Sequence, residues 1–149
     1  MKFWVNWVLP VLGMAVFVIF LYWPGLYGGF FFDDTVNILE PDEIRLHELT
    51  LSSLRAAWGS GWAGPLGRPV SMLSFALNYY FSGFSPFYFK LTNVVVHVVN
   101  ALLAGALLFL FSRASGLAVD HGSTRRWRFL AIGLAGMWAI HPIQITSVL

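Results

Sequence analysis

The sequence predicts an all-α integral membrane protein with three transmembrane helices and a long outer loop that carries short interfacial helices. Of its 149 residues, 58% are hydrophobic and only 11% are charged, whereas a soluble domain carries about 25% charged residues. Three apolar runs approach or exceed the length of about 20 residues that crosses a bilayer. The chain has no cysteine, which excludes disulfides, thiolate metal sites and cysteine nucleophiles.

The three spans are expected at residues 3–23, 87–112 and 129–149. No charged residue occurs between positions 3 and 32, and the second span has the apolar core VVVHVVNALLAGALLFLF. We find no sign of a second domain, so the whole chain is interpreted as one membrane segment. It stops directly after a hydrophobic run, which leads us to expect a fragment of a larger protein.

Charges in the connections predict the orientation. The loop 113–128 holds four arginines against the single acid Asp120, and short loops rich in Arg or Lys stay in the cytoplasm. The N-terminus is therefore expected in the cytoplasm, and residues 24–86 in the periplasm or a lumen. A bacterial inner membrane fits this arrangement.

The outer loop 24–86 is expected to form two short helices. Thr50 can cap a helix whose residues Leu51, Leu54 and Trp58 share one face. Pro69 can open a second helix that runs to about Phe81. At about 20 Å this helix is too short to span, so both are interpreted as interfacial. A tilted span over 70–84 is the alternative, and it would invert the topology that follows.

Asp33 and Asp34 are the first candidates for chemistry. They follow three phenylalanines directly after the first span. Two adjacent carboxylates repel each other and require a cation, a metal or helix N-termini as partners. They can serve as a catalytic base or as ligands of a divalent metal at the membrane face. The alternative is a solvated loop start or a helix cap.

A polar stripe is predicted on the second span. Lys90, Asn93, His97 and Asn100 have spacings of three, four and three residues, which place them on one helix face. Such a stripe can form the wall of a polar pocket near the outer half of the membrane. It can equally provide hydrogen bonds that hold the spans together.

Two further residues stand at breaks in the chain. Arg68 precedes a helix start and can bind a phosphate, or simply reach the lipid headgroups. His141 precedes Pro142 in the third span, where proline frees a backbone carbonyl and the histidine can line a site. A kink at the proline with a histidine that only satisfies local hydrogen bonds is the alternative. No phosphate-binding loop, helical metal motif or nucleophile elbow is present in the sequence, and the small net charge gives no indication of nucleic-acid binding.

Three motifs in order resemble one family. They are FFDDTVNI, GRPVSMLSFALNYYFSGFSPFYFKLTNVVVHVVNALL and HPIQITSV. Together they are similar to the start of a polytopic sugar transferase of the GT-C class. The narrower similarity is to protein O-mannosyltransferases whose membrane part is followed by tetratricopeptide repeats, and to their bacterial relatives.

The resemblance implies a function and a set of site residues. It implies transfer of a sugar from a polyprenyl-phosphate donor to a hydroxyl acceptor, with Asp33 or Asp34 as base and Asn37 shaping the loop. Arg68 and the stripe from Lys90 through Asn93 to His97 would lie near the donor. His141 with Pro142 would match the family's HP element.

The resemblance also implies that this chain is only part of a transferase. Family members have more spans and usually a repeat domain, so this chain is expected to be an N-terminal part that is inactive alone. The alternatives are a non-catalytic membrane scaffold and a lipid-binding accessory subunit. No cofactor is implied beyond a metal at the acidic pair, and the acceptor remains open.

Overall fold

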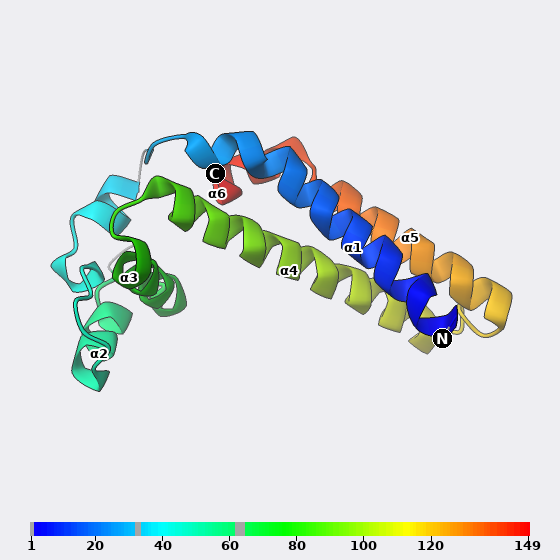
Figure 1. The fold of residues 1–149 in the computed structure, drawn as a ribbon. Coiled ribbons are helices and arrows are strands. Elements are labelled where there is room, and N and C mark those ends of the chain that lie inside the picture. The colour runs from blue at the N-terminus through cyan, green and yellow to red at the C-terminus, as the bar shows by residue number, and fades with distance from the viewer. Residues whose placement is uncertain (1, 32–33, 62–64) are drawn as a thin grey trace. The chain divides into compact units, whose positions relative to one another are not determined.

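The computed structural model describes residues 2–31, 34–61 and 65–149, and every regular element in these ranges is a helix (Figure 1). The described chain divides into two compact units. One contains residues 1–25 and 93–149, and the other contains residues 26–92. Their composition and helices confirm the all-α membrane class.

The first unit is built from long apolar helices. It contains α1 (Lys2–Tyr22), most of α4 (Pro86–Ala114) and α5 (His121–Ala139). Two stretches, Val8–Tyr27 and Pro86–Ala114, are long and apolar enough to cross a membrane. Their outward side chains are large and apolar, as a lipid-facing surface requires; Val16 is 64% exposed and Leu107 is 69% exposed. The first two predicted spans therefore have matching helices.

Small residues allow the helices of this unit to approach closely. A Cβ atom at Gly105 of α4 would lie 3.3 Å from the Cβ of Ala135 on α5. A Cβ at Gly136 of α5 would lie 3.5 Å from the Met14 side chain of α1. Ala131 and Ala135, four residues apart, are both buried. Membrane helices associate through such small residues because backbones can then make extensive van der Waals contact.

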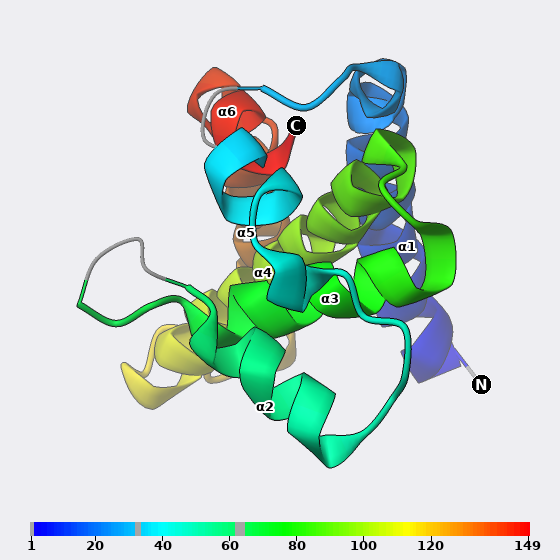
Figure 2. The same ribbon diagram turned by 90° about the vertical axis from the view of Figure 1, so that its left-hand side faces the viewer.

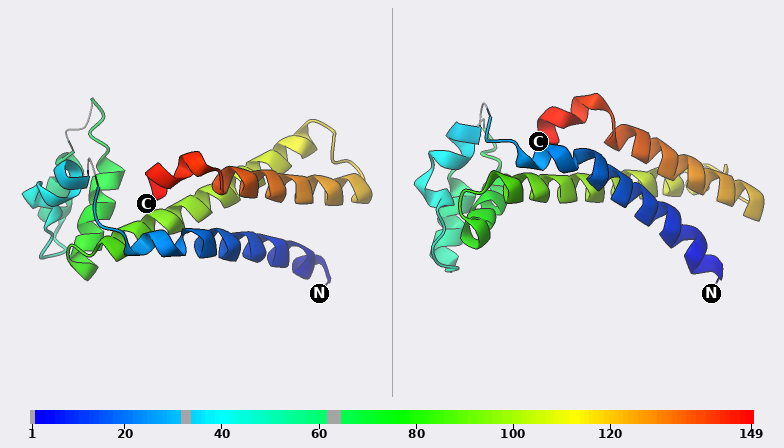
Figure 3. Two further views of the ribbon diagram at one scale, coloured as in Figure 1. Left: turned by 90° about the horizontal axis from the view of Figure 1, so that it is seen from above. Right: turned by 45° about the horizontal axis from the view of Figure 1, so that its top comes forward.

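The third apolar run differs from the single span that we expected at 129–149. Helix α5 begins at His121 and ends at Ala139, and a bend of 54° separates it from the final short helices. These are η4 (Pro142–Gln144) and α6 (Ile145–Val148). Figure 3 shows this turn where the orange helix meets the red segment. Pro142 causes the break because it has no N–H and cannot continue the helix.

The early start of α5 has its own cause. Asp120 and Ser123 form a reciprocal capping box, in which the Ser123 amide donates to Asp120 Oδ1 at 2.8 Å. This amide, with help from the Gly122 amide and Arg126, lowers the pKa of Asp120 below its ordinary value. Three of the arginines assigned to the loop 113–128 therefore lie on the first turns of α5.

The second unit contains the two short helices expected in the loop 24–86. Helix α2 (Leu51–Gly59) begins at Thr50, whose hydroxyl accepts a hydrogen bond from the Ser53 amide. Helix α3 (Pro69–Ser82) has proline in its first turn. Its 14 residues correspond to about 21 Å, which is shorter than a bilayer core. Both predicted helix starts are confirmed, and the alternative span over 70–84 coincides with α3, which is not among the described helices long and apolar enough to cross a membrane.

A small apolar core holds the second unit together. Its buried members are Ile44, Leu46, Ala57, Met72 and Ala76. Figure 2 shows α2 and α3 beside each other, which brings the last three of these residues together. Leu54 packs on the core, whereas Leu51 and Trp58 are exposed.

Three short turns complete the second unit. They are η1 (Trp23–Tyr27), which begins at the end of the first unit, η2 (Thr35–Leu39), a π-helical turn, and η3 (Asp42–Ile44). Arg45 fixes the chain after η3, because it donates to the Leu39 carbonyl and forms an ion pair with Asp42 at 3.1 Å. The segment that follows the first apolar helix is therefore folded rather than extended.

Candidate functional site

Asp34, the described member of the acidic pair, directly precedes η2. The Asp34 side chain turns back along the chain, and its Oδ2 accepts a hydrogen bond from the Phe31 amide at 2.9 Å. The Asp34 amide in turn donates to the Phe31 carbonyl. Asp33 lies outside the described residues. The Asp34 carboxylate is half-buried, so one of its oxygens is held while the group keeps access to its surroundings.

Lys90 lies against the same segment. Its side chain is only 5% exposed, and its ammonium stands 5.6 Å from the centre of the Phe31 ring. A cation over an aromatic face gains electrostatic stabilisation, which partly offsets the cost of burying the charge. The neighbouring Phe30 packs edge-on against Phe89. Phe31 therefore contacts two predicted site residues, one through its backbone and one through its ring.

Asn37 and Arg68 belong to the same unit but have different surroundings. Asn37 is half-buried on η2, next to the buried Ile38. Arg68 precedes α3 in a left-handed conformation with φ of 47°, and its side chain is exposed. Within the described part of the chain, no hydrogen bond or ion pair joins Arg68 to Asp34 or Lys90.

His97 occupies a different environment in the first unit. It is 6% exposed, and its Nε2 lies 2.9 Å from the carbonyl oxygen of Ala139. Because a carbonyl can only accept, Nε2 carries the proton in this contact. The ring packs edge-on against Tyr22, with the ring centres 5.5 Å apart, and lies tilted by 33° against Trp138 at 5.2 Å. Three helices therefore meet around this one histidine.

The Ala139 carbonyl is the shared acceptor of this cluster. The Tyr22 hydroxyl also donates to it, at 2.9 Å. The carbonyl lies at the end of α5, where the amide of Ile143 would normally bond to it in a continuing helix. That amide instead donates to Nδ1 of His141, and Pro142 has no amide hydrogen. Tyr22 and His97 thus satisfy a carbonyl that the break leaves open.

These contacts define the roles of the remaining predicted residues. His141 is exposed and caps η4, so it fixes the break itself. Of the polar stripe, His97 makes a hydrogen bond to another helix, as one of its two interpretations expects, whereas Asn93 is half-buried and Asn100 is exposed. Neither Tyr22 nor Phe31 was proposed as a site residue from the sequence. The only sequence signal for Tyr22 was an aromatic residue with a polar tip at the end of an apolar span.

The described residues contain no group of three or more His, Asp or Glu side chains placed to hold a metal ion. Asp33 is outside these residues. Asp34, the described member of the acidic pair, accepts a hydrogen bond from the Phe31 amide, and the buried Lys90 ammonium lies over the ring of the same residue.

Comparison with curated proteins identifies the relatives of this chain. It is 32% identical over 138 residues to protein O-mannosyl-transferase TMTC3 of Mus musculus, a match that covers 85% of this chain and 13% of that protein. It is 30% identical over 144 residues to protein O-mannosyl-transferase Tmtc1 of Drosophila melanogaster, covering 91% of this chain and 15% of that protein.

The homologues of this chain are protein O-mannosyl-transferases. A third relative, TMTC2 of Mus musculus, is 38% identical over 81 residues, which is 54% of this chain and 8% of that protein. The family resemblance inferred from the three motifs is confirmed. The chain spans about an eighth of the length of the first of these O-mannosyl-transferases, by the 13% coverage. No family model matches the chain, and no solved structure matches it.

Proposed function

We propose that this chain forms part of a glycosyltransferase that moves a hexose, in the manner of an O-mannosyl transfer, from a polyprenyl-phosphate donor to a hydroxyl acceptor. The observation that carries this proposal is the similarity of about 30% to proteins named O-mannosyl-transferases over most of the chain. The acceptor is a protein hydroxyl by the same similarity. The chain alone would lack transferase activity, because it matches a small part of those enzymes.

The chemistry needs one base and one source of positive charge. An inverting transfer requires a base at the acceptor hydroxyl, and the leaving phosphate requires charge stabilisation. We assign the base to Asp34 or its neighbour Asp33. Lys90 supplies positive charge near the same segment, as its contact with Phe31 supports. Asn37 orders the turn, and Arg68 offers an exposed guanidinium that suits phosphate.

The first unit supplies the membrane frame in this proposal. His97 and His141 stabilise the break after α5, as their contacts with Ala139 and Ile143 support, and Asn93 lies one turn before His97 on the same face of α4. α5 together with η4 and α6 forms a third, bent crossing. The arginine-rich turn between α4 and α5 faces the cytoplasm, so the N-terminus lies inside and residues 24–86 lie outside, with α2 and α3 at the interface. A bacterial inner membrane is the expected location.

A chimera tests the proposed function. This chain replaces the 138 matching residues of mouse TMTC3, and transfer of radiolabelled mannose from a polyprenyl-phosphate donor to protein is measured in membranes. Asp33→Asn and Asp34→Asn are compared with Glu43→Gln, which alters an exposed acid of the same loop. Loss of the base should reduce transfer by about 10²–10⁴-fold, whereas the control should retain it.

The outcomes separate the alternatives. Loss in one variant identifies the base. Loss in both, with partial recovery on added Mg²⁺ or Mn²⁺, indicates a metal held by the pair. If both variants keep near-normal turnover, the assignment of the pair is wrong. A chimera that inserts and folds but transfers no mannose even without these substitutions would favour a scaffold or an accessory subunit.

A further inference from the structure

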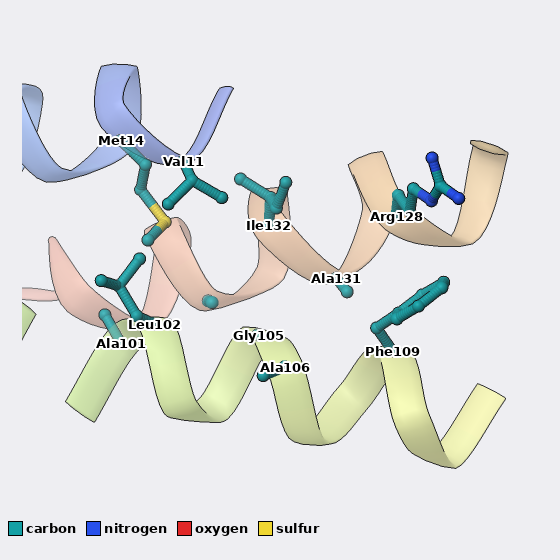
Figure 4. A pocket seen from close by; sticks show the side chains of 11 residues that line it. Val11, Met14, Ala101, Leu102, Gly105, Ala106, Phe109, Arg128, Ala131 and Ile132 are labelled. Carbon is teal, nitrogen blue, oxygen red and sulfur yellow. The ribbon is translucent and has the colours of Figure 1, made fainter. Parts of the chain in front are cut away.

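A cavity of about 150 Å³ lies among α1, α4 and α5 (Figure 4). Ten of its eleven lining residues are apolar, among them Met14, Leu102 and Ile132. The cavity is partly open to the surroundings. A dry apolar cavity of about this volume can accept a benzene-sized group. Its size and lining therefore suit a short stretch of hydrocarbon chain.

The eleventh lining residue is Arg128. Its guanidinium stands 5.8 Å from the centre of the Phe109 ring, and its Nε atom is buried. Figure 4 shows Arg128 and Phe109 together at one end of the cavity, with Met14 and Leu102 toward the other end. The hydrocarbon-lined space thus ends at a positive charge that stands over an aromatic ring.

The surroundings of Arg128 carry an excess of positive charge. Arg113 is in the last turn of α4, and Arg125 lies over the Phe129 ring at 5.9 Å on α5. Asp120 is the single acid between positions 113 and 128. Its carboxylate caps α5 and interacts with Arg126. An anion that reaches Arg128 therefore meets a field dominated by arginine.

We propose that this cavity binds one anionic glycerophospholipid, with part of an acyl chain in the apolar space and the phosphate on Arg128. The planar fork of a guanidinium matches phosphate oxygens in a bidentate geometry. Basic pockets between membrane helices bind anionic headgroups, and the cytoplasmic leaflet is rich in such lipids. The site is distinct from the residues assigned to sugar transfer.

Native mass spectrometry of the 149-residue chain in a non-ionic detergent measures this binding directly. Palmitoyl-oleoyl phosphatidylglycerol and phosphatidylcholine are added separately, because they share acyl chains and differ in charge. One phosphatidylglycerol should bind about fivefold more tightly than phosphatidylcholine, since a basic residue near an anionic headgroup contributes about this factor. The result does not depend on which way the chain lies in a membrane.

Two variants and two matched controls separate the parts of the site. Arg128→Gln should remove the preference for phosphatidylglycerol, and Ala106→Phe should reduce its binding by filling the cavity. The two controls are Arg126→Gln, which removes the arginine that interacts with Asp120, and Leu107→Phe, which enlarges a side chain of α4 that is 69% exposed. Both controls should bind the lipid as the parent chain does.

Three results would overturn the proposal. One is equal binding of the two lipids by the parent chain. Another is an equal loss of preference in Arg126→Gln and Arg128→Gln, which would indicate diffuse attraction to the arginines. The third is unchanged binding in Ala106→Phe. If Ala106→Phe loses helicity in circular dichroism, Ile132→Phe fills the same cavity from α5 and replaces it as the deciding variant.

Discussion

The carbonyl of Ala139 should couple Tyr22 and His97 energetically. Both side chains donate to this oxygen at 2.9 Å, one from each of two neighbouring helices. Tyr22→Phe and His97→Phe each remove one donor and keep an aromatic ring in place. After either substitution the carbonyl still accepts one hydrogen bond, so each single loss should be small.

The magnitudes follow from this redundancy. A side-chain hydrogen bond between membrane helices contributes about 0.6 kcal/mol on average, which is the expected cost of Tyr22→Phe. The double variant leaves a carbonyl with no donor, because the Ile143 amide is bound to His141 and residue 142 is proline. An unsatisfied buried carbonyl costs about 1–3 kcal/mol. The double loss should therefore exceed the sum of the single losses by about 1 kcal/mol.

A double-mutant cycle measures this coupling. The free energy of reversible unfolding is determined in mixed micelles with increasing dodecyl sulfate for the parent chain, both single variants and the double variant. Tyr27→Phe serves as a control, since Tyr27 is 72% exposed. If the two single losses add to the double loss within about 0.3–0.5 kcal/mol, the carbonyl does not depend on this pair and the reasoning is refuted.

Three other predictions concern packing, protonation and orientation. Gly105→Leu should destabilise the first unit by about 1–3 kcal/mol through overpacking, because a Cβ there already lies 3.3 Å from α5, whereas Gly133→Leu has open space and should be tolerated in the same unfolding assay. The backbone amides that Asp120 caps lower the pKa of its carboxyl group. The stability that Asp120 contributes to the start of α5 is therefore present above the ordinary pKa and is lost as pH falls through the lower folded value. A carboxyl NMR titration should give a midpoint below 3.8, and a midpoint at or above 3.8 would contradict the cap. Leu66 is 87% exposed and Val119 is 80% exposed, and the chain has no cysteine of its own. An impermeant maleimide added outside should label Leu66→Cys and should not label Val119→Cys. Labelling of Val119→Cys from outside would show that the topology is the reverse of the one proposed.

Apolar composition and the residues that begin helices account for the parts of the fold that the sequence predicts. Long apolar runs predicted the first two spans, and Thr50 and Pro69 predicted the starts of α2 and α3 because caps act through local backbone geometry. A kink at Pro142 was an open alternative for the third span, but the sequence did not predict that α5 ends there with a bend of 54°. An apolar run of 21 positions, 129–149, has the composition of a span, and hydropathy averages over the effect of Pro142 on a single helical turn.

The candidate site was less predictable for a different reason. Helical spacing placed Lys90, Asn93, His97 and Asn100 on one face, but it could not show which of them has a neighbour. Lys90 is buried against Phe31, His97 is buried against Tyr22, and Asn100 is exposed. Partners of this kind come from segments distant in sequence, so they depend on tertiary packing rather than on local pattern.

Two polar residues on α4 therefore require different interpretations when they are mutated. His97 donates to a carbonyl that the Pro142 break leaves open, so its loss acts on stability first and on any activity only through the frame. Lys90 places a charge beside the segment that holds Asp34, and its contact is with an aromatic ring rather than a backbone acceptor. A lysine that served packing alone would be replaceable by an apolar side chain of similar length. A lysine that serves a phosphate would not be, because an apolar replacement keeps the contact with Phe31 and removes the charge.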